Sequence, residues 1–459
     1  MEGYRFEEDS MGKVAIPADA LYGAQTQRAI LNFPVSGLRM PNRFIKILAL
    51  IKGCAAMANK ELGLLDKEIA DAIVSASNEI SDGKWADQFP VDVFQTGSGT
   101  STNMNVNEVI ANRASLILGF DAGSGKVHPN DHVNLCQSSN DIIPTAIHVC
   151  ALISISDTLL PSLFHLRALL DKRAAETMDI VKTGRTHLMD AVPLRLGREI
   201  GGWSHQVQKN IERIQSCILR LSELAIGGTA VGTGLNAHPD FAARTIGLVI
   251  EKTGLSFAET GNHYAAQASL DTVVELSGHL KSTAITLMKI ANDLRLMNSG
   301  PVTGLSEIYL PALQPGSSIM PGKVNPVICE SVLMACAQVI GNDAAITAAA
   351  TLGSFELSTG MPLIAHSILQ SIDITGNAAR LLADKAIAGF EVNEKHISEL
   401  LGRNPMLATS LVPLLGYDKA ARIVRKALEE KRSIIEIARE ELKIPEEELL
   451  RLLAPENMI

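Results

Sequence analysis

The stretch LDTVVELSGHLKSTAITLMKIANDL, residues 270–294, decides the fold class. Its apolar residues recur every three, four and seven positions, which is the spacing of one buried stripe on an α-helix. The pattern extends from about His263 to Met297, so the predicted helix is roughly 45 to 55 Å long at 1.5 Å per residue. A rod of that length exceeds the width of an ordinary domain. The stripe consists of Leu270, Val273, Val274, Leu280, Ala284, Leu287, Met288, Ala291 and Leu294.

Four further segments have the same helical periodicity, at about 142–180, 193–224, 326–351 and 362–390. Pro144 suits the first turn of its helix, and Pro161 predicts a bend. Small residues on these helices, as in AAITAAATLG at 344–353, permit close packing against copies of the same chain. A large monomeric bundle is the alternative. We therefore expect an all-α protein in which an elongated central five-helix bundle at 140–391 lies between smaller, mainly helical domains at 1–139 and 392–459.

The composition agrees with this expectation and excludes several classes of protein. Apolar residues make up 46% of the 459 residues but aromatic residues only 4%, which favours aliphatic helices over a β-sandwich. A net charge of −9 disfavours a nucleic-acid partner. The six cysteines form no CxxC pair and indicate reduced thiols in a cytoplasmic protein. The first residues lack a signal-peptide pattern, and we expect no membrane span.

Two segments in the first third of the chain carry more polar residues than helix packing needs. Gly97-Ser98-Gly99-Thr100 offers backbone N–H and hydroxyl groups to an anion, although an ordinary helix cap is the bland alternative. The second segment contains HPNDH at 128–132 and QSSND at 137–141. Its two histidines suggest a metal site, but Pro129 interrupts a common helical face and no third ligand is evident, so we expect none. The hydroxyls and amide of 138–140 could hold a carboxylate or cap a helix.

Two later segments contain candidates for acid–base chemistry. In GRTHLMD, 184–190, His187 lies between a hydroxyl and an acid in a turn linking two long helices, which suits a general acid or base. In GSSIMPGKVNP, 316–326, a hydroxyl pair lies between two glycines and precedes Lys323 and Asn325. A serine is a weak base unless backbone N–H groups and a cation surround it. Such a loop can clamp a carboxylate and deliver that base when it closes.

The last segment resembles the signature of the fumarase/aspartase superfamily. The segments GSGT, NMNVNEVIANRA, HPNDHVN, QSSND, GRTHLMDA, GGTAVGTGLN, LMKIANDLR and GYDKAA are similar, in the right order, to class II fumarate hydratases. The similarity runs from DSMGKVAIPADALYGAQTQRA to APENMI, which is essentially the whole chain.

The resemblance implies a cytoplasmic homotetramer with a shared helical core and active sites built from three subunits. It implies reversible hydration of fumarate to (S)-malate in the citric acid cycle, with no metal and no organic cofactor. Ser317 would remove the C3 proton, while His187, oriented by Glu330, would help the hydroxyl leave. The aci-carboxylate intermediate would be held at Lys323 and Asn325. The positions that match substrate binding are Ser98, Gly99, Thr100, Ser138, Ser139, Asn140, Thr186, Ser318, Lys323, Val324 and Asn325. A second dicarboxylate site would comprise His128, Pro129, Asn130 and Asp131.

The closest rival is aspartate ammonia-lyase, which has the same fold. His187 and Ser139 disfavour it, because the aspartase pattern has Gln and Thr at these positions. LPALQ at 310–314 and Val327 look more like aspartase, and Gly125 stands where many fumarases have Arg before the second site, unless Lys126 substitutes. A non-enzymatic, crystallin-like protein is the other alternative, and the retained set of polar residues argues against it.

Overall fold

The computed structural model describes residues 3–459 and is predominantly helical, which confirms the predicted all-α class. The sheets in the described part of the chain have two strands each. The chain forms two compact units, and each of the long helical stretches contributes residues to both. Unit 1 comprises Met1–Leu160, Glu212–Ser282 and Ala337–Thr375, and unit 2 comprises Pro161–Ile211, Thr283–Cys336 and Gly376–Ile459. The predicted boundaries at 139/140 and 391/392 stay predictions.

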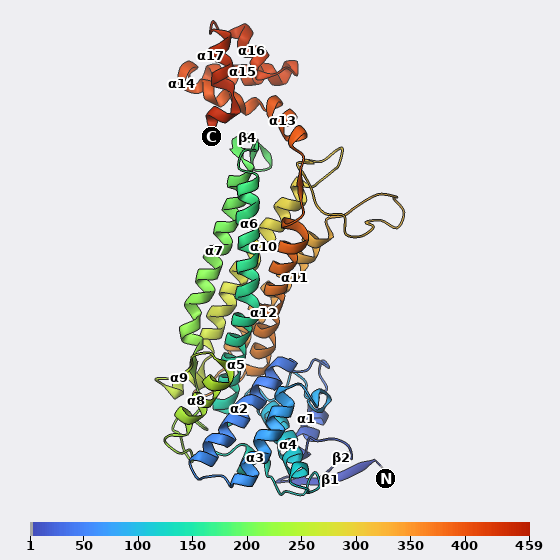
Figure 1. Cartoon of the computed structure of the whole chain (residues 1–459), viewed down its shortest axis with the longest axis vertical. Helices are drawn as coiled ribbons and strands as arrows, with labels where there is room; N and C mark the ends of the chain where they lie inside the picture. Colours follow the sequence, from blue (N-terminus) through green and yellow to red (C-terminus); the bar gives the residue numbers. More distant parts are fainter. Residues whose placement is uncertain (1–2) are drawn as a thin grey trace. The chain divides into compact units, whose positions relative to one another are not determined.

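The N-terminal part of unit 1 is a short hairpin followed by packed helices (Figure 1). Helix α2 packs against α3, α5 and α8, and α3 packs against α4. The buried face of α2 is aliphatic and aromatic, with Phe44, Leu48 and Ile51 inaccessible, yet it also contains the fully buried Lys52. The elements are β1 (Tyr4–Asp9), β2 (Gly12–Pro17), α1 (Ala24–Asn32), α2 (Asn42–Glu61), α3 (Lys67–Ser81), α4 (Thr100–Ile117), α8 (Phe241–Thr253) and α9 (His263–Ala268).

The first long helical stretch begins earlier than the sequence pattern predicted. A capping box between Ser138 and Asp141 starts α5 (Ser139–Ser154), so Pro144 lies in the second turn, not the first. A π-helical turn, Ile155–Leu159, then joins α5 to α6 (Leu160–Glu176). This irregularity lies directly before Pro161, whose missing N–H cannot continue a regular helix.

The other long helices are α7 (Leu196–Leu221), α10 (Asp271–Met297), α11 (Val327–Ala350) and α12 (Met361–Leu382), with a π-helical turn at Ala383–Ile387. Two further predicted helix starts were wrong. Residues 193–195 end a β-strand, and residues 263–268 form the separate helix α9. The backbone at Ser269 is extended, with φ −141° and ψ 148°, and this break separates α9 from α10.

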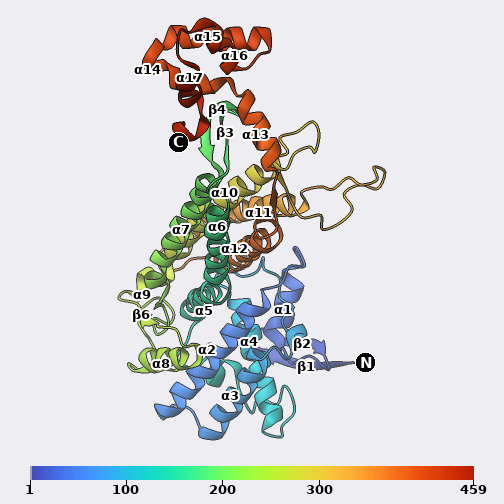
Figure 2. The same ribbon diagram turned by 45° about the horizontal axis from the view of Figure 1, so that its top comes forward.

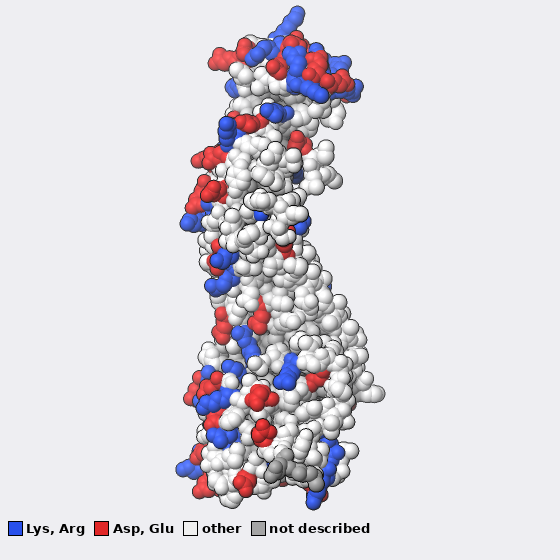
Figure 3. Space-filling model, turned by 90° about the vertical axis from the view of Figure 1, so that its right-hand side faces the viewer, with Lys and Arg blue, Asp and Glu red and all other residues white. Residues whose placement is uncertain are grey.

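Unit 2 contains the hairpin β3 (Val181–Thr186) and β4 (Met189–Arg195), and the C-terminal helices (Figure 2). The C-terminal helices have a core of their own, which includes Leu407, Leu411, Ile423, Ile437 and Leu449. Figure 3 shows basic and acidic side chains interspersed over the face of these helices that the view presents. The elements are α13 (Glu394–Arg403), α14 (Val412–Leu415), α15 (Tyr417–Glu430), α16 (Ile434–Glu441) and α17 (Glu446–Leu453).

Two helical stretches are long and apolar enough to cross a membrane by length and composition alone. In Ser139–Glu176, 72% of the apolar window is buried inside the chain, as in the core helix of a folded protein. In Val327–Ala350 only 39% of the window is buried. Most of the α11 window is therefore not buried within the single chain, and its exposed residues include Met334.

Candidate functional site

Unit 1 contains a pocket of about 630 Å³ at the N-termini of α4 and α5, called the α4–α5 pocket below. Asp131 is the one formally charged residue in its lining. Because helix N-termini present unsatisfied N–H groups and partial positive charge, the pocket suits an anion. Its polar lining includes Thr100, Asn103, Asn134, Ser138, Ser139, Asn140 and Asn236.

Two glycines shape the start of α4 beside this pocket. A Cβ on Gly97 would lie 2.0 Å from the Thr359 carbonyl oxygen, so only glycine fits against the backbone at Thr359. Gly99 caps α4 with a left-handed φ of 72°. The Ser98 and Thr100 hydroxyls then hydrogen-bond each other at 2.8 Å. The segment GSGT therefore forms the N-terminus of α4 and also offers hydrogen-bond donors to the pocket.

The polar residues at the start of α5 are tied to neighbouring segments. The Ser138 hydroxyl accepts the Asn140 N–H at 3.2 Å, and the Asn140 side chain donates to the Ala230 carbonyl at 2.8 Å. The carboxylate of the fully buried Asp141 accepts N–H groups from Ser138, Gly227 and Thr229. Burial raises the Asp141 pKa to about 6, against these hydrogen bonds.

The site residues predicted from the sequence do not include Lys52, Asn103 and Asn134, although Asn103 belongs to the polar run that follows Thr100. The Lys52 ammonium donates to Asn134 Oδ1 at 2.7 Å, and Asn103 Nδ2 donates to Ser139 Oγ at 2.9 Å. Burial lowers the Lys52 pKa to about 7, partly opposed by the charge of Asp141. A lysine within the apolar stripe ILALIKGCAAMA, 47–58, is the sequence signal that could have identified it.

The predicted second site lies on a π-helical turn, Pro129–Val133. His128 Nδ1 accepts the Asp131 N–H at 3.1 Å, and His132 Nδ1 accepts the His128 N–H at 2.9 Å. The Lys126 ammonium lies 5.3 Å from the centre of the Phe120 ring. Binding of a dicarboxylate at 128–131 stays a prediction.

His187 lies at the tip of the β3–β4 hairpin, which links α6 to α7. His187 and Leu188 both have left-handed φ angles, 56° and 63°, as a tight two-residue hairpin turn requires. Thr186 is the last residue of β3, and both Thr186 and His187 are exposed. The turn predicted at this position is therefore the tip of a β-hairpin.

Buried charges brace this hairpin. Glu307, only 1% exposed, forms ion pairs with Lys182 at 2.8 Å and Arg185 at 2.9 Å. Lys182 also pairs with Glu199 at 3.0 Å. On the other side, Asn404 donates to the Ala191 carbonyl at 2.7 Å. Apart from Arg185, which lies within GRTHLMD, these bracing residues have no signal in the sequence, because their partners are distant along the chain.

The loop at 316–325 is closed across its neck. The Gly316 N–H donates to the Lys323 carbonyl at 2.8 Å, and Asn325 Nδ2 donates to the Gly316 carbonyl at 2.7 Å. The Lys323 ammonium donates to Asn325 Oδ1. Inside the loop, Ser317 Oγ accepts the N–H groups of Ile319 at 3.2 Å and Met320 at 2.9 Å. The loop thus surrounds the Ser317 oxygen with backbone donors. Ser318, Lys323 and Val324 are exposed.

The structure does not bring all of the predicted site residues together in one chain. Among residues 3–459, Ser317, His187 and Glu330 form no hydrogen bond or ion pair with one another. Glu330 lies exposed on the first turn of α11. The substrate-binding candidates at 98–100 and 138–140 belong to unit 1, whereas those at 186, 318 and 323–325 belong to unit 2 together with the three acid–base candidates.

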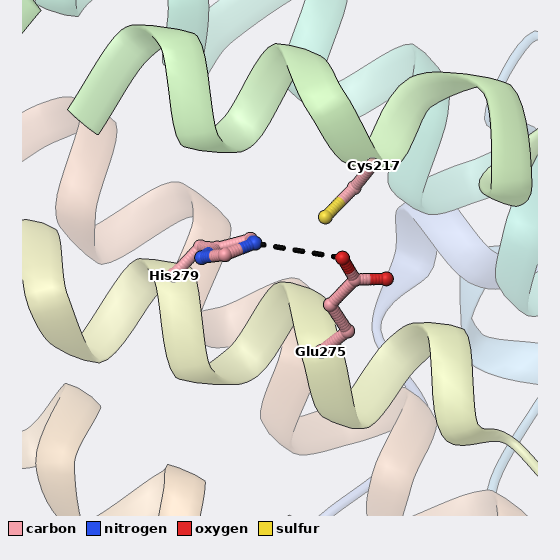
Figure 4. Close-up of side chains that lie close together, drawn as sticks. All are labelled: Cys217, Glu275 and His279. Atoms are coloured by element: carbon pink, nitrogen blue, oxygen red, sulfur yellow. Dashed lines mark ion pairs between the residues drawn. The ribbon is translucent and has the colours of Figure 1, made fainter. Parts of the chain in front are cut away.

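One group in the described part of the chain could offer three ligand atoms to a metal: Cys217 of α7 with Glu275 and His279 of α10 (Figure 4). The three ligand atoms lie within 4.8 Å of one another. However, the Arg220 guanidinium already binds both Glu275 oxygens, at 2.7 and 2.5 Å. Burial also raises the Cys217 pKa to about 11, which disfavours the thiolate. A metal would have to displace Arg220, so the cluster is better described as an ion pair.

Two family models match the chain. Residues 12–341 match the model described as Lyase, and residues 407–459 match Fumarase C C-terminus. The chain is 54% identical over its full length to a Pseudomonas aeruginosa protein named fumarate hydratase class II 2, of which it covers 99%.

Solved structures agree with the sequence relatives. A recombinant class II fumarase from Schistosoma mansoni superposes with a TM-score of 0.96 at 41% identity, with 99% of each chain covered. A cobalt-bound fumarate lyase:delta crystallin protein from Brucella melitensis gives a TM-score of 0.93 at 42% identity, also with 99% of each chain covered.

Proposed function

The chain belongs to the class II fumarate hydratase family, and we propose that it catalyses the reversible addition of water to fumarate to give (S)-malate. It is then a carbon–oxygen hydro-lyase whose substrate is a small dicarboxylate. The observation that carries the proposal is the closed 316–325 loop, in which two N–H groups point at Ser317 Oγ beside a lysine and an asparagine.

In the malate-to-fumarate direction, Ser317 Oγ would take the proton from C3. The electron pair of the C3–H bond would move into the neighbouring carboxylate and form an aci-carboxylate. Backbone donors stabilise negative charge on the serine oxygen, which makes the oxygen a competent base. Lys323 and Asn325 lie in the same loop and would hold the developing charge on the carboxylate.

The second step breaks the C2–O bond. The electron pair returns from the aci-carboxylate to form the C2–C3 double bond, and His187, with Glu330 as its orienting carboxylate, would protonate the departing hydroxyl to give water. His187 is suited to this role because it is an exposed imidazole at the tip of a braced hairpin. Thr186 and Ser318 adjoin the two catalytic residues and would contact substrate.

The other carboxylate of the substrate would occupy the α4–α5 pocket. Neutral hydroxyl and amide donors line this pocket at two helix N-termini, which stabilise an anion without a cation in direct contact. The proposed contacts are Ser98, Gly99, Thr100, Ser138, Ser139 and Asn140.

We also propose that the chain works as a homotetramer with shared active sites. Two features support this. Ser317, His187 and Glu330 do not contact one another within one chain, and the long helices expose large apolar side chains. Leu219 is 75% exposed and Met334 is 69% exposed. Burying such faces against copies of the chain would complete the sites and the central bundle. A cytoplasmic location and a role in the citric acid cycle accompany this proposal.

The experiment follows the ultraviolet absorbance of fumarate in plain buffer and in buffer with ammonium. We expect the absorbance to fall in plain buffer, with malate as the product. Loss of absorbance only with ammonium would indicate aspartate ammonia-lyase, and no change in either buffer would favour a crystallin-like structural protein.

The assigned roles are tested with two variants. Ser317→Ala and His187→Asn should each lower kcat by about 10² to 10⁴, the usual contribution of a general acid or base. Sedimentation checks that the oligomer is intact. A wild-type rate in either variant would remove that residue from its proposed role.

A further inference from the structure

Lys52 is a fully buried lysine that the proposed mechanism does not use. Its side chain is 0% exposed on the core face of α2, among Leu48, Ile51 and Ala55. Removing an ammonium from water is costly, and a methionine of similar length would fill the same volume without that cost. The position of the Lys52 charge therefore calls for an explanation.

A chain of hydrogen bonds connects Lys52 to the α4–α5 pocket. Its ammonium donates to Asn134 Oδ1 at 2.7 Å. The same oxygen accepts Asn103 Nδ2 and Asn107 Nδ2, each at 3.2 Å. Asn103 Nδ2 also donates to Ser139 Oγ at 2.9 Å. The charge thus fixes the direction of the Asn134 side chain, and Asn134 fixes Asn103.

This network determines what Ser139 can do. Because Ser139 Oγ already accepts a hydrogen bond from Asn103, its own proton is available for donation to another acceptor. Ser139 and Asn103 both line the pocket. A carboxylate in the pocket is the acceptor that such a donor fits.

The charge balance points the same way. No cation lines the pocket, and Asp131 contributes a negative charge to it. Asp141, the buried anion whose charge acts on Lys52, is itself held by three backbone N–H groups. In its protonated form Lys52 therefore supplies positive potential from behind the neutral donors, where a bound carboxylate would benefit from it.

We propose that Lys52 is a positioning residue of the α4–α5 pocket: through Asn134 and Asn103 it orients the Ser139 hydroxyl toward a substrate carboxylate and offsets the charge of that carboxylate. This inference rests on the proposed function. It assigns Lys52 to substrate binding, and it does not give Lys52 a part in proton transfer.

The test compares Lys52→Met with the matched control Lys60→Met. Lys60 lies on the same helix, is partly exposed and pairs with Asp71 at the surface. The pocket would hold the carboxylate that does not change in the reaction, so losing Lys52 weakens ground state and transition state alike. We expect KM for fumarate to rise about tenfold in Lys52→Met with kcat nearly unchanged, and neither to change in Lys60→Met.

A rise in KM with an unchanged kcat distinguishes a positioning role of Lys52 from a merely structural one. A variant that is only less stable has fewer active molecules, so its apparent kcat falls while its KM stays at the wild-type value. An unchanged KM in folded Lys52→Met would overturn the proposal, even if kcat fell.

Titration calorimetry with succinate, which cannot be hydrated, makes the inference testable apart from the reaction. If the wild-type protein fails to hydrate fumarate, the proposed function is wrong, but a tenfold weaker succinate affinity in Lys52→Met still supports the assignment of Lys52. Equal succinate affinities would overturn that assignment.

A second variant covers the case in which Lys52→Met does not fold. Asn103→Ala leaves Lys52 its partner Asn134 but breaks the link to Ser139. We expect the same rise in KM, and an unchanged KM in Asn103→Ala would also overturn the proposal. In the double variant of Lys52→Met and Asn103→Ala, the two increases in KM should not add, because both substitutions disrupt the same hydrogen-bond network.

Discussion

Replacing Glu307 with glutamine should loosen the hairpin that presents His187. Glu307 is 1% exposed and forms an ion pair with Arg185, while Lys182 retains a second partner in Glu199. Removing one member of a buried ion pair costs about 3 to 5 kcal/mol. Because Lys182 keeps Glu199, we expect a loss near the lower end, about 3 kcal/mol in the free energy of unfolding, which is about a hundredfold in the equilibrium constant.

The assay is urea unfolding followed by circular dichroism, at one fixed protein concentration because oligomer stability depends on concentration. The control is Glu199→Gln, whose side chain is 25% exposed and whose partner Lys182 keeps Glu307, so a loss of only about 1 kcal/mol is expected. In the same samples kcat should fall about tenfold or more in Glu307→Gln, since a displaced hairpin mispositions His187. If Glu307→Gln is no less stable than Glu199→Gln, the bracing role assigned to Glu307 is wrong.

Two further predictions concern stability in unit 1. The hydrogen bond from Arg113 lowers the pKa of Glu79 to about 2. The ionised Glu79 therefore contributes fully to the free energy of unfolding above about pH 4.5, and this contribution is lost as the pH falls through 2. Glu79→Gln should therefore cost about 1 kcal/mol at pH 7, and a difference from wild type that does not shrink on acidification would contradict this. Gly97→Ala should lower stability by about 1 to 3 kcal/mol, because its Cβ would lie 2.0 Å from the Thr359 carbonyl oxygen. The control Gly202→Ala places its Cβ in open space on a helix and should be neutral or slightly stabilising when both variants are compared by thermal unfolding; equal effects of the two substitutions would refute the steric argument.

The helical class and the approximate extent of the long helices could be predicted from the sequence, because a buried helical face repeats every 3.6 residues. The errors lay at the ends of helices. Ser138 and Asp141 start α5 earlier by a reciprocal cap, and residues 193–195 pair with β3 instead of continuing α7. Each depends on one local hydrogen-bonding arrangement that periodicity does not report.

Much of the candidate site was also predictable, because glycines, hydroxyls and amides cluster in short segments with a chemical purpose. The loop at 316–325 is such a case, and the structure adds how its neck closes and how Ser317 Oγ receives two N–H groups. The supporting residues were not predictable. In the sequence Lys52 is a single charged residue within an apolar helix, and only the folded structure places it beside Asn134.

The sequence by itself determined the helical fold class and the short segments that contain the candidate site residues, since both depend on the spacing of residues that are close together in the sequence. The tertiary structure alone decided which distant groups support those segments. Lys52 lies 82 residues from Asn134, and Lys182 and Arg185 lie far along the chain from Glu307. The partner of a buried charge is fixed only when the chain folds. Burial removes water as an alternative partner, and a specific contact must then offset the desolvation free energy of the charge.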